Sequence, residues 1–256
     1  MTLIDFAAIL GALAWIPPIA VGLYRILTRP LVEIITQQSI EVGFTNFGPI
    51  INVRLAFSAY RREITVADVQ IELRHEAGDK RVLTWHGIVQ PLSRLSTPAG
   101  TAYSEKEQSV LAIKLNTRDI DERMIRFQDP VFHKGKKELI EKILKKITFL
   151  KETGNLSIET IAKSQEELDL ISFNKQFFNW KSGTYHFQFA LKSANGFVLK
   201  NFSYEFQLSS TDIELLESNK TLLEEAYKDE LLQGTPNYSS PILPWRWRYP
   251  YLLMKT

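Results

Sequence analysis

The chain has 256 residues, a formal net charge of +2 at pH 7 and no cysteine. The lack of cysteine excludes a disulfide framework, a thiolate metal site and a thiol nucleophile. The length accommodates an apolar N-terminal segment followed by one large domain, and no internal repeat is visible.

The N-terminal segment Phe6–Tyr24 holds nineteen residues without a charge, between Asp5 and Arg25. At about 1.5 Å per helical residue, this length nearly matches a hydrocarbon core of roughly 30 Å. We therefore predict a transmembrane anchor over residues 1–28. The pair Pro17 and Pro18 predicts a strong kink within it, because each proline removes a backbone donor.

Two other interpretations of this segment stay open. The proline pair could instead turn a short hairpin within one leaflet. Ala20-Val21-Gly22 resembles a signal-peptide cleavage site, although Asp5 stands where a basic residue is expected.

Arg25 and Arg29 follow the apolar run and no basic residue precedes it, so the positive-inside rule predicts a single-pass protein of the plasma or inner membrane with a cytoplasmic domain. The lipid bilayer is then one expected partner. We read the Asn-x-Ser/Thr sequons as accidents of composition; they begin at Asn155, Asn201, Asn219 and Asn237.

Alternating apolar and polar residues predict strands through the first half of the domain. The expected strands are Leu31–Thr36, Ile40–Thr45, Ile51–Ala59, Ile64–Val66, Val69–Leu73, Arg81–Val89 and Ser109–Thr117. A bulge or tight turn near Ala67-Asp68 reconciles two opposite parities, and Glu76–Asp79 is a hairpin turn. A polar loop is expected over Gln90–Lys106.

Helical spacing replaces the alternation after Phe132. Phe132–Glu152 predicts an amphipathic helix, and Ala162–Leu170 a second, shorter one, which together form a helical insertion over about 132–170. Between His133 and Lys151 there are seven lysines and two glutamates. We mark Lys142, Lys145 and Lys146 as candidate contacts to an anionic membrane face. The alternative is an ordinary amphipathic helix whose lysines lie in water.

An aromatic hairpin is the strongest late signal. Tyr185–Leu191 and Phe202–Leu208 alternate, and Asn195-Gly196 between them predicts a type I′ turn. A helix follows, with Thr211 as N-cap and Glu214 completing a capping box. Gly234 and Pro236 are expected to end it.

These elements predict a mainly β fold with α additions: an antiparallel β-sandwich over 29–234 with two or three peripheral helices. Gly183-Thr184-Tyr185, at the start of the penultimate strand, resembles the tyrosine corner of immunoglobulin-like domains. The resemblance covers Ile40–Ser209 and concerns architecture alone. It implies a buried tryptophan between the sheets, for which Trp85 is the candidate. The chain departs from antibody-type domains by lacking both inter-sheet cysteines.

No residue pattern predicts catalysis, a cofactor site or a metal site. The histidines lack the spacings that bring two imidazoles to one zinc, and no phosphate-binding or dinucleotide glycine motif occurs. His75 is interpreted as the wet end of a core strand, and His186 as a surface residue. The acidic cluster of Glu166, Glu167 and Asp169 is interpreted as a solvated helix face. We therefore predict a protein that is not an enzyme.

The segment 235–256 combines aromatic rings with arginines. Its candidate contact residues are Trp245, Arg246, Trp247, Arg248 and Tyr249. Such rings should lie on a membrane headgroup region, on a protein partner or on the flank of the domain itself. Single-stranded nucleic acid is the weakest candidate, because no wider basic surface supports it.

Three classes of function follow from this organisation. The favoured one is a membrane-anchored β-sandwich that acts as an interaction or scaffold subunit of a membrane-associated complex. The second is a membrane-perturbing effector that uses the kinked anchor and the Trp/Arg tail. The third is an enzyme of unrecognised type.

Overall fold

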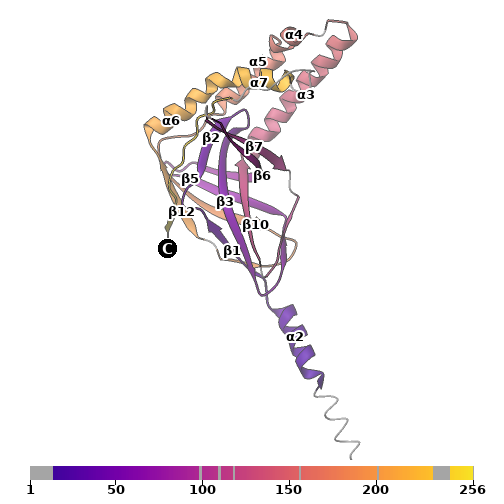
Figure 1. Ribbon diagram of the computed structural model, residues 1–256, viewed down its shortest axis with the longest axis vertical. Helices are drawn as coiled ribbons and strands as arrows, with labels where there is room; N and C mark the ends of the chain where they lie inside the picture. Colours follow the sequence, from indigo (N-terminus) through magenta and orange to yellow (C-terminus); the bar gives the residue numbers. More distant parts are fainter. Residues whose placement is uncertain are drawn as a thin grey trace, which may run out of the picture.

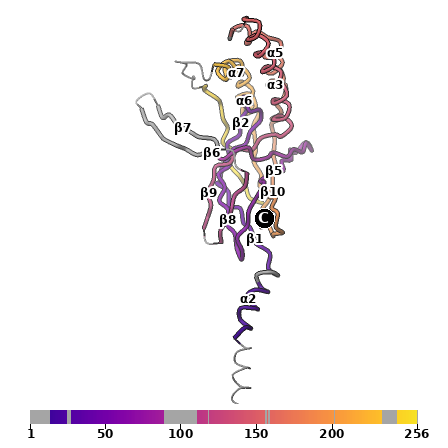
Figure 2. Tube along the Cα trace, turned by 90° about the vertical axis from the view of Figure 1, so that its right-hand side faces the viewer, coloured from indigo at the N-terminus to yellow at the C-terminus, as the bar shows by residue number. Residues whose placement is uncertain are grey.

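A computed structural model describes residues 14–97, 100–108, 111–117, 119–155, 157–200, 202–232 and 243–255. It is mostly β, with one large curled sheet and a group of helices at one end (Figure 1). A single helix, α2, projects from the opposite end in both views (Figures 1 and 2).

The large sheet has eleven strands. Its order is β11-β1-β3-β9-β6-β5-β10-β12-β13, with β2 also pairing with β3 and β7 also pairing with β6. The strands are β1 (Leu31–Thr36), β2 (Glu41–Thr45), β3 (Gly48–Tyr60), β5 (Asp68–His75), β6 (Lys80–Thr97), β7 (Gly100–Gln108), β9 (Ile120–Gln128), β10 (Gly183–Lys192), β11 (Val198–Lys200), β12 (Ser203–Leu208) and β13 (Leu253–Lys255). A separate pair joins β4 (Ile64–Val66) to β8 (Ile113–Leu115). Pairing is antiparallel except between β1 and β11.

The curl of the sheet follows from the chain path. β11 pairs with β1 at one edge, and β12, which follows it after two residues, pairs with β10 near the other edge. The two edges must therefore approach each other. The apolar faces of the alternating strands lie inside the curl. Five side chains there are at most 1 % exposed: Val53, Phe57, Ile71, Phe127 and Phe187.

The helices form a layer over one end of the sheet. They are α3 (Pro130–Glu152), α4 (Ile158–Ala162), α5 (Gln165–Gln176), α6 (Ser210–Glu217), the 3₁₀ turn η1 (Ser218–Leu222) and α7 (Leu223–Leu232). α3 begins after Asp129, whose side-chain Oδ1 accepts a hydrogen bond from the Val131 amide at 2.8 Å. Its apolar stripe, including Phe132 and Ile143, packs toward α5 and the sheet.

The prediction of a transmembrane anchor over residues 1–28 is wrong for the part of it that the structure describes. α2 (Ile16–Leu27) has 12 residues, so it is about 18 Å long, against roughly 30 Å of hydrocarbon. Among the described residues, no helix combines the length and the apolar character that crossing a membrane requires. A single-pass membrane protein with a cytoplasmic domain is therefore not supported. The part of the expected span before residue 14 lies outside the described residues.

Pro17 and Pro18 lie in the first turn of α2, where backbone amides have no intrahelical acceptor and a proline removes no bond. The predicted kink involves residues before Ala14, which lie outside the described residues. Beyond the prolines α2 continues to Leu27, and the Thr28 amide bonds to the Tyr24 carbonyl oxygen at 2.9 Å.

Several predicted loops, strands and turns differ from those in the structure. The expected loop over Gln90–Lys106 falls largely within β6 and β7, and the expected strand Ser109–Thr117 is reduced to β8. The predicted type I′ turn is wrong, because neither Asn195 nor Gly196 has a positive φ. β10 does pair with β12, but over Gly183–Gln188, so the connection is longer than a tight hairpin.

The last helical segment is capped by Ser209 with Asp212, not by Thr211 with Glu214, and it divides into α6, η1 and α7. Gly234 and Pro236 lie outside the described residues.

The tyrosine-corner geometry is present locally. The Tyr185 hydroxyl donates to the Lys181 carbonyl oxygen at 3.0 Å and accepts from the Lys181 amide at 2.8 Å. The fully buried tryptophan is Trp180, which is 3 % exposed and donates from Nε1 to the Gly43 carbonyl oxygen at 2.9 Å. Trp85 is only partly buried, so its assignment as the central tryptophan is wrong. The structure supports a curled, mostly β fold and does not by itself establish an immunoglobulin-like one.

Candidate functional site

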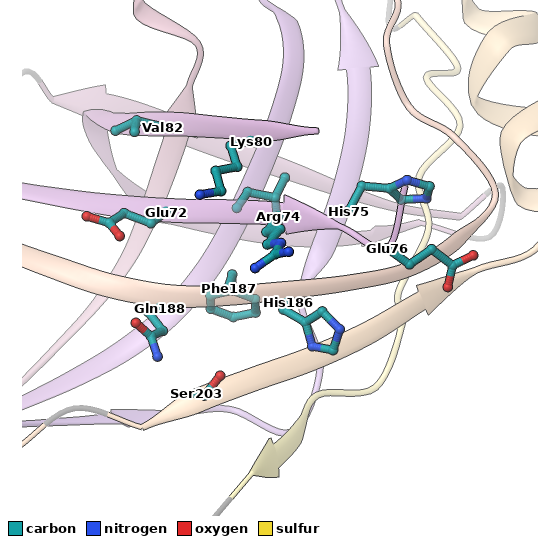
Figure 3. A pocket seen from close by; sticks show the side chains of 11 residues that line it. Glu72, Arg74, His75, Glu76, Lys80, Val82, His186, Phe187, Gln188 and Ser203 are labelled. Carbon is teal, nitrogen blue, oxygen red and sulfur yellow. The ribbon is translucent and has the colours of Figure 1, made fainter. Parts of the chain in front are cut away.

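A trough lies on the outer face of the sheet. It has a volume of about 630 Å³ and lies across β6, β5, β10 and β12 (Figure 3). Alternate residues of β5 point inward, including Ile71 and Leu73, so Glu72 and Arg74 point outward into the trough. The outward residues lining it are Glu72, Arg74, Lys80, Val82, His186 and Gln188.

The sheet register places three basic side chains in a row across this trough. Arg74 is opposite Lys80 on β6 and opposite His186 on β10. Directly paired residues on one face have Cβ atoms about 5 Å apart, so Lys80, Arg74 and His186 are near neighbours. On the far side, His186 Nδ1 lies 3.2 Å from Glu205 Oε2, and Lys255 of β13 also pairs with Glu205.

The neighbouring His75 lines one end of the trough, where its ring is held by the turn that follows β5 (Figure 3). Its Nδ1 accepts from the Ala77 amide at 3.2 Å, which leaves Nε2 as the donor to the Ser182 carbonyl oxygen at 3.1 Å. Both ring nitrogens are therefore used, and the ring is 5 % exposed. His75 does end the core strand β5, but the prediction that this end is wet is wrong, because the residue is buried. Glu76 is likewise engaged, because its Oε2 accepts from the Thr184 amide at 2.9 Å, which holds the pKa of Glu76 below its usual range.

A second polar cluster lies buried between the helices and the β2–β3 turn. Lys136 Nζ donates to the Asn46 carbonyl oxygen at 3.0 Å and lies 3.3 Å from Glu230 Oε1, with the ring faces of Phe47 and Tyr227 about it. Glu167 is 3 % exposed in the same region, so its interpretation as part of a solvated helix face is wrong. Burial, together with the nearby Glu230 carboxylate, raises the pKa of Glu167 to about 7, and Lys136 opposes this shift. This cluster joins α3, α5 and α7 to the sheet, so its role is structural.

The predicted contact residues fall on separate parts of the molecule. Pro17, Pro18 and Arg25 belong to α2, and Arg29 is exposed just after it. Lys142 and Lys145 are exposed on α3, while Lys146 is half-buried. The structure does not bring these residues together with the tail.

The tail residues lie along the domain's own flank. Trp245 packs against the core, and Trp247 stacks so closely on Gly43 of β2 that a Cβ there would overlap its ring. Arg248 pairs with Val42 through two backbone hydrogen bonds of 2.8 and 2.9 Å, and its guanidinium lies 2.7 Å from Asp212. Arg246 is exposed and donates from Nη1 to Ser218 Oγ at 2.9 Å, and Tyr249 is 60 % exposed. Of the three surfaces considered for these rings, the flank is the one that Trp245 and Trp247 occupy.

Sequence reasoning did not find the basic row, because it depends on which strands pair. Alternation predicts that Arg74 and His186 point outward, but only the register makes them neighbours. The same is true of His86 and His133, whose rings lie 4.7 Å apart across β6 and α3. Within the part of the chain that the structure describes, no group of three or more potential ligands is arranged to hold a metal ion.

Comparison with protein-family models, with curated proteins and with solved structures finds no match for this chain. Any assignment of function therefore rests on the geometry of the chain itself.

Proposed function

We propose that this chain is an interaction protein whose curled β domain presents helix α2 to a protein partner. The observation that carries the proposal is the exposure of α2. Its large apolar side chains are each more than half exposed: Trp15, Ile16, Ile19, Val21, Leu23 and Tyr24. Contiguous exposed apolar surface of this kind marks interaction sites in folded proteins.

The free energy involved is large enough to matter. Burying a large aliphatic or aromatic side chain fully is worth about 1.5–3 kcal/mol, so covering the exposed halves of six such residues contributes on the order of 5 kcal/mol. Among the side chains that the structure describes, the buried apolar residues of the core begin at Val32, after this helix.

The shape of the apolar surface favours one kind of partner. Ile19 and Leu23 share one side of α2 and Val21 lies on another, and all are exposed, so the apolar surface is not confined to one face of the helix. An enclosing groove on another protein covers such a helix on most sides, as in helix-in-groove recognition. The tail contributes little to the effector alternative, because Trp245 and Trp247 pack on the domain.

An immunoglobulin-like arrangement of the sheet is a finer proposal. The Tyr185 corner supports it, as does the buried Trp180, which bonds to Gly43 of β2 and contacts the Tyr185 ring. Such a scaffold suits binding, and we propose a binding role in place of a catalytic one.

Site-specific photo-crosslinking tests the partner. A photo-reactive residue replaces Leu23 in the full chain within its native cells, with the same residue at exposed Thr65 of β4 as the control. We expect a crosslinked protein at position 23 that is absent at position 65. The purified partner should then bind the purified full chain, and Leu23→Asp should weaken that binding more than about ten-fold, a change of 1.4 kcal/mol or more.

The matched variant is Val82→Asp, which adds the same charge at a 43 % exposed apolar site on the sheet. It should leave the affinity unchanged. Crosslinks to a second copy of this chain alone, crosslinks to lipid alone, or equal effects of Leu23→Asp and Val82→Asp would each contradict the proposal.

A further inference from the structure

Two of the three side chains of the basic row, Lys80 and Arg74, have no ion-paired carboxylate in the part of the chain that the structure describes, whereas His186 faces Glu205. Among the described residues, neither Lys80 nor Arg74 makes a side-chain hydrogen bond or an ion pair. By contrast, several other exposed cations whose side chains the structure describes on the sheet are ion-paired, such as Lys192 with Asp68 at 3.2 Å and Lys200 with Glu33.

The carboxylates that line the same trough do not serve the row. Figure 3 shows the Glu72 and Glu76 carboxylates pointing away from the Arg74 guanidinium on opposite sides. Glu76 is bonded to the Thr184 amide, and Glu205 is shared between His186 and Lys255. What remains at the centre is the Arg74 guanidinium between the Lys80 and His186 side chains.

This arrangement opposes the stability of the sheet. Like charges directly opposite on neighbouring strands are destabilising. The pairing of Arg74 with Lys80 therefore brings the fold no gain, whereas a bound anion would convert the repulsion into shared attraction. A guanidinium provides a planar fork of donors that fits an oxyanion through two hydrogen bonds, and an ammonium adds a mobile point charge. His186 Nδ1 lies 3.2 Å from Glu205 Oε2, which leaves Nε2 as the ring nitrogen available to a bound anion.

The trough is larger than an inorganic anion. Its volume of about 630 Å³ lies within the range of sites for small organic ligands. Beyond the basic row it offers Val82 as an apolar contact and Gln188 and Ser203 as hydrogen-bonding groups. We propose that Lys80, Arg74 and His186 bind the phosphoryl group of a small phosphomonoester, whose organic part lies over Val82, Gln188 and Ser203.

Calorimetric titration of the purified full chain with sn-glycerol 3-phosphate tests this site. Inorganic phosphate is the second probe and succinate the third, at constant ionic strength. We expect the phosphomonoester to bind more tightly than inorganic phosphate, because it also contacts the rest of the trough, and succinate to bind most weakly. Arg74→Gln should weaken phosphomonoester binding by about ten-fold or more, the scale of one lost charge-assisted pair.

The control is Arg54→Gln, which removes the same charge from an exposed arginine on β3 that is paired with Glu122 at 3.6 Å. It should change the affinity less than about two-fold, since only screened, distant charge is lost. Arg74→Lys, which keeps the charge and loses the fork, should fall between Arg74→Gln and the unmodified protein. Circular dichroism of each variant confirms that it is folded, and since positions 54 and 74 are both exposed the substitutions leave the core intact.

The proposal is overturned if no phosphate-containing probe binds, or if Arg74→Gln and Arg54→Gln weaken binding equally, which would indicate general charge attraction. It is also overturned if succinate binds as tightly as the phosphomonoester, which would assign the row to carboxylates. None of these outcomes bears on whether α2 binds a protein, so this site and the proposed function stand or fall separately.

Discussion

The side chain of Asn219 pairs with the backbone of Arg246 as one strand pairs with another. Asn219 Nδ2 donates to the Arg246 carbonyl oxygen at 2.8 Å, and the Arg246 amide donates to Asn219 Oδ1 at 2.9 Å. The same Nδ2 donates to the Phe44 carbonyl oxygen at 3.0 Å, and Asn219 is fully buried. A single amide thus joins η1, β2 and the C-terminal tail.

Removing this amide should release the tail and destabilise the domain. Asn219→Ala leaves buried backbone groups of Phe44 and Arg246 without partners, at a cost of about 2–4 kcal/mol in the free energy of unfolding. Urea denaturation measures the loss, and hydrogen exchange should show faster exchange at the Arg246 and Arg248 amides. Asn195→Ala, at an exposed loop position, is the control. Unchanged stability of Asn219→Ala would mean that the tail is not held this way.

The contact between Gly43 and Trp247 should appear as a coupling energy. A Cβ at position 43 would overlap the indole ring, so Gly43→Ala should cost about 2 kcal/mol in the unmodified chain. In a Trp247→Ala background the same substitution should cost close to nothing, because the obstructing ring is gone. The double-mutant cycle, measured by urea denaturation, checks this. Additive effects would show that Trp247 does not lie on Gly43.

Stability should depend on pH through Glu167. Its pKa in the folded chain is about 7, above the ordinary value of 4.5, so the folded state holds a proton that the unfolded state releases. The contribution of Glu167 to the free energy of unfolding is fully present below pH 4.5 and is lost as the pH rises through about 7. Between pH 4.5 and pH 8 this group should reduce the free energy of unfolding by about 2 kcal/mol, after allowance for partial solvation.

Glu167→Gln replaces the titrating carboxyl with a neutral amide of the same shape. It should therefore be more stable than the unmodified chain at pH 8 and about equal to it at pH 4.5. Guanidinium denaturation across this interval provides the measurement, with Glu166→Gln on the adjoining, more accessible position as the control. Parallel stability curves for Glu167→Gln and the unmodified chain would contradict the assignment.

The corner at Tyr185 should be worth more than an ordinary surface hydroxyl. Tyr185→Phe removes the group that satisfies both the amide and the carbonyl of Lys181, and the ring is 1 % exposed. The expected loss is about 1–3 kcal/mol. Tyr60→Phe is the matched control, because its hydroxyl bonds to Glu33 at the surface, and it should cost less than about 0.5 kcal/mol. Equal losses in the two variants would remove the structural role of the corner.

The sequence by itself determined the elements whose pattern is local. The alternation in β3, β5, β10 and β12 predicted strands and named their inner faces, because a period of two sets which side chains share a face. The helical spacing after Phe132 predicted α3 for the same kind of reason. The Gly183-Thr184-Tyr185 motif correctly marked a tyrosine corner, whose hydrogen bonds span only four residues.

Only the tertiary structure decided which strands pair and where the apolar N-terminal helix and the aromatic C-terminal tail lie. The aromatic pattern around Asn195-Gly196 predicts a tight hairpin equally well whether Val198 pairs with β10 or, as found, with Leu31 of β1; that choice depends on packing across the whole sheet. The uncharged run of nineteen residues does not reveal the length of α2, which is 12 residues, or that α2 stands clear of the domain. Nor can spacing show that Trp247 meets Gly43, about two hundred residues away, or that Lys80, Arg74 and His186 form one row. Those neighbours arise from long-range register, which no local period encodes.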